Sequence, residues 1–158
     1  MRLSSLLPGI LLFVVTLPAP IHRAGAQQVA DTLWAPPGLV PAWARDSGPR
    51  VAIDAAHFNF HTVDGRYRPF ADLLRRDGCR VTGSDREFSA EALGGIDILV
   101  IANALNRRNA EDWSLPTPPA FSAAEVEAVR EWVRGGGSLL LIADHMPFPG
   151  GASSLAAA

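Results

Sequence analysis

From about residue 51 onward, apolar runs alternate with amphipathic segments. The runs cover 51–54 (VAID), 96–103 (IDILVIAN) and 138–144 (SLLLIAD). Continuous runs of Val, Ile and Leu are typical of strands that are buried on both faces, as in parallel sheets. A weaker run at 79–82 is the candidate for the second strand in chain order. The pattern therefore predicts four strands of one parallel sheet.

Helical signals lie between these runs. A first helix is predicted between Pro69, which suits a first helical position, and Gly78, which suits a C-terminal cap. A short second helix is predicted from Ser89, an N-cap residue, to the two glycines at 94–95. Each predicted strand is thus separated from the next by a helix or a long connection.

The third predicted helix is the clearest element of the chain. Ser122 and Glu125 have the spacing of a capping box, and Gly135 follows the last apolar position of the helical stripe. The complete order is then strand and helix in strict alternation. Right-handed crossovers turn this order into an α/β fold, an open parallel sheet with helices on both faces, most simply with strand order 2-1-3-4.

Three of the predicted strands end in a polar residue, namely Asp54, Asn103 and Asp144. In open parallel sheets, ligands bind outside the carboxyl ends of the strands, so these side chains are expected at one functional edge. Each residue also has a simpler explanation, because Asp and Asn commonly close a strand by bonding to the following turn. The sequence leaves both interpretations open.

The segment after the first strand, 55–62 (AAHFNFHT), alternates polar and aromatic residues. If it is extended, His57, Asn59 and His61 face the same side. If it is helical, the two histidines share a face one turn apart, which would allow a shared metal, whereas in an extended chain they lie about 13 Å apart. Both geometries predict that the two histidines lie together, and His145 adds a third imidazole to the same edge.

We interpret His57, His61, Asp144 and His145 as candidate catalytic residues. Such a group could hold zinc or provide general acids and bases, since imidazole titrates near neutral pH. The spacing matches no fixed ligand motif, so no metal or cofactor is assigned. Alternatively, the histidines pack against neighbouring aromatic residues and bond to the backbone.

Four further residues are candidate ligand contacts: Asp54, Asn59, Asn103 and Trp113. Trp113 belongs to the connection 104–120, which leaves the same edge of the sheet and could act as a lid. Its indole could stack on a sugar or an aromatic ligand, and the arginines at 107–108 could hold a carboxylate or phosphate. Residues of this kind also often only cover a domain or face solvent.

The residues before the first strand do not continue this pattern. Residues 1–26 have a basic start, an apolar stretch and a small-x-small ending, as in a secretory signal peptide, so we expect export to the periplasm or the medium. The apolar stretch is short for a membrane span, which makes an uncleaved anchor the weaker alternative. Residues 27–49 are rich in Pro and Ala and are expected to form a linker or a surface-hugging arm.

Composition narrows the function classes. The formal net charge is −2, and removal of 1–26 would take two arginines away, so nucleic acid is not an expected partner. Every basic residue is Arg, which excludes a lysine-based mechanism. Cys79 has no second cysteine to pair with, and the chain has no nucleophile elbow and no P-loop. A serine or cysteine nucleophile is therefore unsupported.

Three segments carry a family resemblance: IDAAHFNFHTVDGRYRPFADLL, IDILVIANAL and EVEAVREWVRGGGSLLLIADHMPFPGGAS. Over about 51–153 the chain resembles an uncharacterised bacterial domain family related to class I glutamine amidotransferase-like proteins. The resemblance implies a flavodoxin-like α/β fold and no established activity. In true class I amidotransferases the strand after the glycine-ended helix leads to the nucleophilic cysteine. Here that place holds Asp144 and His145, which argues against glutamine hydrolysis.

Relatives of this kind usually continue beyond the point where this chain stops, which is expected to be one turn into a helix at 152–158. We therefore expect 50–158 to be a partial domain whose apolar edge strand pairs with another chain or a missing C-terminal segment. Three functions stay open: a hydrolase-like enzyme using His57, Asp144 and His145, a small-molecule or carbohydrate-binding module using Trp113 and the strand ends, and a nonfunctional fragment.

Overall fold

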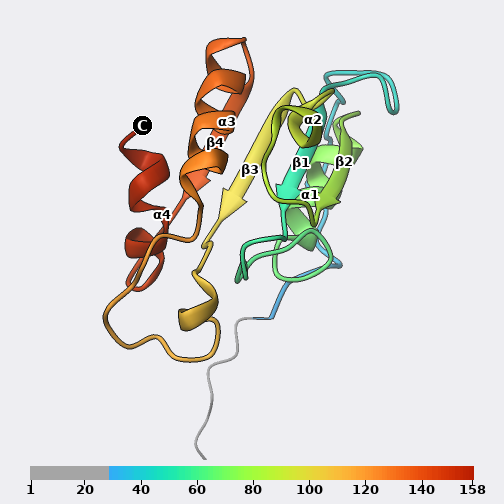
Figure 1. Cartoon of the computed structure of the whole chain (residues 1–158). Coiled ribbons are helices and arrows are strands. Elements are labelled where there is room, and N and C mark those ends of the chain that lie inside the picture. Colours follow the sequence, from blue (N-terminus) through green and yellow to red (C-terminus); the bar gives the residue numbers. More distant parts are fainter. Residues whose placement is uncertain (1–28) are drawn as a thin grey trace, which may run out of the picture.

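The computed structural model describes residues 29–158, so the predicted signal peptide 1–26 lies outside the described residues. Its centre is a four-stranded sheet in which all neighbouring strands are parallel and the strand order is β2-β1-β3-β4 (Figure 1). The strands are β1 (Arg50–Asp54), β2 (Arg80–Ser84), β3 (Ile98–Ala102) and β4 (Ser138–Ile142). This arrangement confirms the predicted flavodoxin-like α/β fold and its strand order.

Strand β3 is shorter than the apolar run that predicted it. Asp97 precedes the strand; its N–H donates to the Arg50 carbonyl at 2.9 Å and its carboxylate accepts the Arg50 N–H at 2.8 Å. At its end, Asn103 has a φ of 52°, which is incompatible with an extended strand. The predicted strand 96–103 was therefore two residues too long at its start and one too long at its end, and β4 likewise ends two residues before Asp144.

The sheet is covered on both faces, which explains the unbroken apolar runs. Alternate residues of the strands enter two separate cores, since side chains in a strand point to opposite faces. Val51 and Ile53 lie in the core under helix α1 (Arg68–Arg76). Leu99 and Ile101 lie in the other core with helices α2 (Ala90–Leu93) and α3 (Ala123–Arg134).

The predicted helix caps are confirmed by the geometry of the helix ends. The hydroxyl of Ser89 accepts the N–H of Ala92 at 3.1 Å at the start of α2. Both halves of the capping box between Ser122 and Glu125 are formed at the start of α3. Helix α1 starts one residue before Pro69, and Gly78 follows its end with a φ of 94°.

The C-terminal helix is longer than the sequence pattern indicated. Helix α4 (Phe148–Ala156) begins four residues before Ala152, although its first turns contain Pro149 and two glycines. Packing supports it, because Phe148 and Leu155 are buried and Leu155 belongs to the core beneath α3. Among the described residues β4 pairs with β3 alone, so the predicted edge strand is confirmed.

Residues 29–49 run as an arm along the outside of the domain beside α1 and β2 (Figure 1). Backbone bonds hold the arm: Trp43 N–H donates to the carbonyl of Asp77 at 3.2 Å and Gly48 N–H to that of Gly78 at 2.9 Å. No helix of the described residues is long and apolar enough to cross a membrane.

Candidate functional site

The carboxyl ends of the strands lie at one end of the sheet, at the bottom of Figure 1, where the connections 55–67 and 103–122 cover them. The residues predicted for the site do gather at this end, but in two separate groups. We call the first the buried network: Asp54, His57, Asn59 and Glu125. We call the second the outer cluster: His61, Asn103, Trp113, Asp144 and His145.

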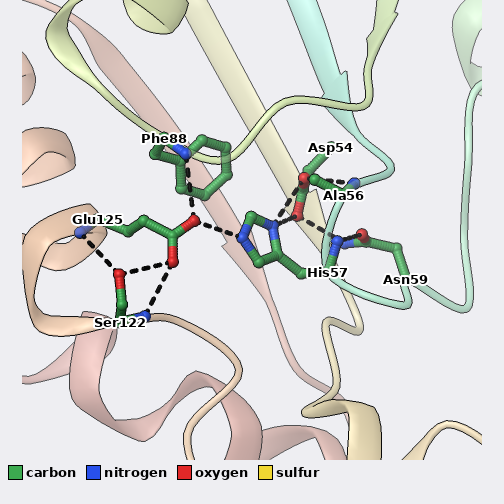
Figure 2. A network of polar contacts seen from close by, with 7 residues as sticks. All are labelled: Asp54, Ala56, His57, Asn59, Phe88, Ser122 and Glu125. Atoms are coloured by element: carbon green, nitrogen blue, oxygen red, sulfur yellow. Dashed lines mark hydrogen bonds and ion pairs between the residues drawn. The ribbon is translucent and has the colours of Figure 1, made fainter.

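Asp54 ends β1 and organises the turn that follows it. Its carboxylate is fully buried and accepts hydrogen bonds from the Ala56 N–H at 3.1 Å and the Asn59 Nδ2 at 2.8 Å (Figure 2). It also contacts His57 Nδ1 at 2.9 Å. An Asp that closes a strand by binding the next turn is one of the two interpretations that the sequence left open.

His57 lies between two carboxylates in the interior. Its Nε2 is 2.7 Å from Glu125 Oε1, on the opposite side of the ring from Asp54 (Figure 2). The rings of Phe88 and Phe121 flank it, each with its centroid at 4.7 Å. Burial acts to lower the pKa of His57, but the hydrogen bonds and negative charges of the two carboxylates outweigh it, so the pKa is raised. The geometry therefore favours the imidazolium form.

Glu125 is the residue of this network that sequence reasoning missed, since its spacing indicated only a helix cap. One carboxylate oxygen accepts the Phe88 N–H at 3.1 Å and contacts His57, and the other accepts the Ser122 N–H at 2.9 Å and hydroxyl at 2.8 Å. Burial acts to raise the pKa of Glu125, but the hydrogen bonds from Ser122, His57 and Phe88 lower it overall. No signal within the sequence links positions 57 and 125, which are 68 residues apart.

The buried network connects the end of β1 to the start of α3 and has little room for a ligand. His57 is 5% exposed, and both of its ring nitrogens are engaged by carboxylates. The geometry gives His57 a positioning role in the described conformation, with no ring nitrogen open to a substrate.

The expected pairing of His57 with His61 is wrong. The segment 55–62 forms neither a strand nor a helix, and Phe58 has a φ of 47°, a left-handed conformation that interrupts regular structure. His57 points into the interior, whereas His61 contacts Asn103. The alternation of polar and aromatic residues did not predict the side-chain directions here, because alternate residues point to opposite sides only in a regular strand.

Asn103 is the centre of the outer cluster. It is almost fully buried in a left-handed backbone conformation, which Asn tolerates better than most residues. Its side-chain oxygen accepts the backbone N–H of Asp144 at 3.3 Å, and its amide nitrogen lies 3.2 Å from His61 Nδ1. With this amide orientation Asn103 donates to Nδ1, so neutral His61 carries its proton on Nε2. Burial, together with the charge of Arg66, lowers the pKa of His61 despite the nearby Asp144, which favours the neutral form.

Asp144 and His145 form the exposed part of the outer cluster. His145 Nδ1 lies 2.9 Å from Asp144 Oδ1, and the His145 backbone N–H donates to the same oxygen at 2.8 Å. Partial burial acts to raise the pKa of Asp144, but the hydrogen bonds and charge of His145 lower it. A negatively charged acceptor and an imidazole are thus presented to solvent side by side.

Trp113 brings an aromatic surface to these polar groups. Its ring packs edge to face against His145, Phe60 and Phe148, with centroid distances of 5.9, 5.6 and 5.2 Å. The side chain of buried Asn109 holds the loop, because its Nδ2 donates to the carbonyls of Asp112 at 2.9 Å and Ser114 at 3.0 Å. Trp113 nevertheless stays 43% exposed, so part of the indole is accessible.

Arg66 is a second residue that sequence reasoning missed. Its guanidinium carbon lies 3.9 Å from the centroid of the Phe60 ring, a cation–π arrangement, and its charge acts on His61. Arg66 and Phe60 also line a hollow of about 540 Å³, whose other lining residues belong to the arm and to 62–68 and not to the outer cluster. An Arg directly after a glycine in a loop gives no sequence signal for this role. By contrast, Arg107 and Arg108 lie on the short helix η1 (Arg107–Asn109) and are exposed.

The described residues contain no group of three or more His, Cys, Asp or Glu side chains that could hold a metal ion. This follows from the positions of the histidines: His57 belongs to the buried network, whereas His61 and His145 belong to the outer cluster, so the three imidazoles do not meet. The arrangement instead offers hydrogen-bond donors and acceptors beside an aromatic ring.

No protein-family model and no curated protein matches the chain. Among solved structures, the chain is similar to one described as "mmIFT52 N-terminal domain", with 18% sequence identity and a TM-score of 0.47. The match covers 58% of this chain and 34% of that chain, so it spans about a third of the length of the matched domain. No residue role is carried over from this neighbour.

Proposed function

We propose that this domain binds a small polar ligand, a carbohydrate, at the outer cluster. The observation that carries the proposal is the part-exposed indole of Trp113 beside Asp144 and His145 at the carboxyl end of a parallel sheet. Ligands of open α/β sheets bind at this end of the strands. A sugar presents an apolar ring face together with hydroxyl groups, and the outer cluster offers a matching surface for each.

The polar groups of the outer cluster suit hydroxyl recognition. Asp144 can accept two hydrogen bonds, and the Nε2–H of neutral His61 is a donor. The backbone of Asp144 and the ring of His61 are both fixed by Asn103, which limits the ordering that binding requires. Fixed donors and acceptors beside an aromatic wall are what a small-molecule site needs for orientation.

Calorimetric titration of the full chain with a panel of neutral monosaccharides and oligosaccharides tests this proposal. Trp113→Ala and Asp144→Asn should each weaken binding of the sugar that binds by about tenfold or more. Trp34→Ala is the matched control, since Trp34 is an exposed tryptophan of the arm. The proposal fails if no sugar binds the wild-type chain, or if Trp34→Ala and Trp113→Ala weaken binding equally.

A second candidate, a hydrolase-like enzyme, is favoured by one observation. The Asp144–His145 pair is exposed and its two side chains are 2.9 Å apart, as in an acid/base pair whose imidazole is oriented by a carboxylate. Asp144 also stands where the resemblance to class I amidotransferases would place a nucleophilic cysteine. In this case His145→Gln should abolish hydrolysis of a glycoside or ester panel while sugar binding persists. Sugar binding by the wild-type chain without hydrolysis of any member of the panel would favour the first candidate.

We also propose, from residues 1–26, that the protein is exported and that this segment is removed. The support is the order of basic, apolar and small residues in the sequence. Expression of the full chain in a bacterium followed by N-terminal sequencing should find mature protein that begins near Gln27. Recovery of the intact chain in the cytoplasm would count against this proposal. The relation to glutamine amidotransferase-like proteins likewise stays a prediction.

A further inference from the structure

A second pocket lies away from the outer cluster, where the arm meets the end of α1 and the edge strand β2. Its volume is about 690 Å³, within the range of small-molecule sites. It is lined by residues of the arm (Pro41, Trp43, Arg45 and Asp46) and of α1, β2 and their connection (Arg75, Arg76, Cys79, Arg80, Val81 and Thr82). None of these residues belongs to the buried network or the outer cluster.

The outer wall of this pocket is held in place by the docked arm. The Ala42 N–H donates to the carboxylate of Asp77 at 2.8 Å, in addition to the backbone bonds from Trp43 and Gly48. The approach is so close that only glycine fits at position 78. A Cβ there would lie 2.5 Å from the carbonyl oxygen of Trp43, and the φ of 94° also disfavours other residues. The pocket is therefore built before any ligand enters.

Positive charge dominates the lining. Four arginines face one carboxylate, Asp46, among the lining residues. Arg75 is neutralised by Asp72 at 3.0 Å, whereas Arg45, Arg76 and Arg80 have no ion pair with a carboxylate among residues 29–158. The lining thus carries more guanidinium groups than carboxylates, although Arg75 and Arg76 also lie in the last turn of α1, where basic residues are favoured, and the Asp77 carboxylate binds the arm nearby.

The guanidinium groups are partly ordered by neutral acceptors. Arg80 donates from Nε and Nη2 to the carbonyl of Gly48 at 3.3 and 3.2 Å, and Arg75 donates from Nη2 to that of Val81 at 3.2 Å. Carbonyl oxygens fix these side chains without cancelling their charge. Planar guanidinium forks of this kind match the oxygens of a phosphate group.

The remaining wall is aromatic and uncharged. Trp43 is exposed over 42% of its surface, and burial, with the charge of Asp77, raises the pKa of the Cys79 thiol, so that side chain stays neutral beside an anion. A planar ring attached to the anion would find the indole as a stacking partner.

We propose that this pocket binds a small phosphate monoester that carries a planar ring, with Arg45 and Arg76 on the phosphate and Trp43 against the ring. Arg75 and Arg80 complete the positive lining. The site is independent of carbohydrate binding at the outer cluster, because it uses other residues on another side of the sheet.

Calorimetric titration of the full chain with phenyl phosphate, and separately with inorganic phosphate, tests the site. The wild-type chain should bind phenyl phosphate more tightly than inorganic phosphate, and rising salt should weaken both. Arg45→Gln and Arg76→Gln should each weaken phenyl phosphate by about tenfold, since a charge-assisted hydrogen bond is lost in each. Both arginines are exposed, so these variants should keep the wild-type urea midpoint.

Arg134→Gln is the matched control, because it removes an exposed guanidinium at the end of α3, outside the pocket lining. Trp43→Phe should reduce the preference for phenyl phosphate over inorganic phosphate, and Trp113→Ala should leave it unchanged. The proposal is overturned if wild type shows no binding at millimolar concentrations, or if the double variant Arg45→Gln/Arg76→Gln binds as tightly as Arg134→Gln.

Discussion

Replacement of Glu125 by Ala should destabilise the domain far more than a helix cap alone would predict. The carboxylate serves three partners at once: the buried His57 ring, the buried Phe88 N–H and Ser122 at the exposed end of the capping box. Removing it leaves the Phe88 N–H without its acceptor, which by itself costs about 1–3 kcal/mol. It also leaves His57 with Asp54 as its single carboxylate, which costs less than the roughly 3–5 kcal/mol of a buried charge left unpaired.

We therefore expect Glu125→Ala to lower the free energy of unfolding by about 3–5 kcal/mol, a large part of the roughly 5–15 kcal/mol of a typical domain. Urea unfolding followed by circular dichroism measures this as a shift of the midpoint by more than about 1 M. Glu125→Gln keeps the shape of the side chain and removes its charge, so its cost should fall between those of Ala and wild type.

Glu127→Ala is the matched control, since Glu127 lies on the same helix and pairs with Arg130 at 2.9 Å while its side chain is 55% exposed. An exposed ion pair contributes about 0–1 kcal/mol. If Glu125→Ala destabilises the domain no more than Glu127→Ala does, the buried network does not connect β1 to α3 in the way described above.

Three further outcomes follow from the same structure. The raised pKa of His57 stabilises the domain fully below pH 6.5, the ordinary value, and this contribution is lost as pH rises through the raised pKa. The lowered pKa of Glu125 stabilises the domain above pH 4.5, and this contribution is lost as pH falls through the lowered pKa. Urea midpoints should therefore peak between pH 4.5 and 6.5, and a flat profile would exclude the charged network. Gly78→Ala should destabilise by more than about 1 kcal/mol in urea titrations, because its φ is positive and Trp43 leaves no space; a stabilised variant would contradict this. Leu140→Lys, on the part-exposed edge strand β4, should reduce light scattering on heating without changing the urea midpoint, and unchanged scattering would rule out this edge as the aggregating surface.

The fold could largely be predicted from local patterns in the sequence. The apolar runs predicted four strands, the capping box predicted α3, and handedness rules with short connections left the strand order that is observed. The ends of helices and strands were less predictable where they depend on contacts between residues distant in sequence. Asp97 binds Arg50 just before β3 begins, and α4 forms across Pro149 and its glycines because buried neighbours stabilise it.

The candidate site was predictable in location but not in arrangement. Topology places Asp54, Asn103 and Asp144 at one end of the sheet, and that follows from the order of strands along the chain. Which of the surrounding groups touch each other depends on the irregular segments 55–67 and 103–122. Loop conformations with residues such as Phe58 and Asn103 at positive φ have no periodicity from which side-chain directions could be inferred.

By itself, then, the sequence determined a parallel α/β sheet, its two covered faces and the edge at which polar residues collect, because periodicity, caps and crossover handedness act locally. Only the tertiary structure decided that His57 is buried between Asp54 and Glu125, that His61 and His145 face a separate cluster, and that arginines of the arm and of α1 and β2 line one pocket. These contacts join residues far apart along the chain, and their partners are selected by packing and charge in three dimensions.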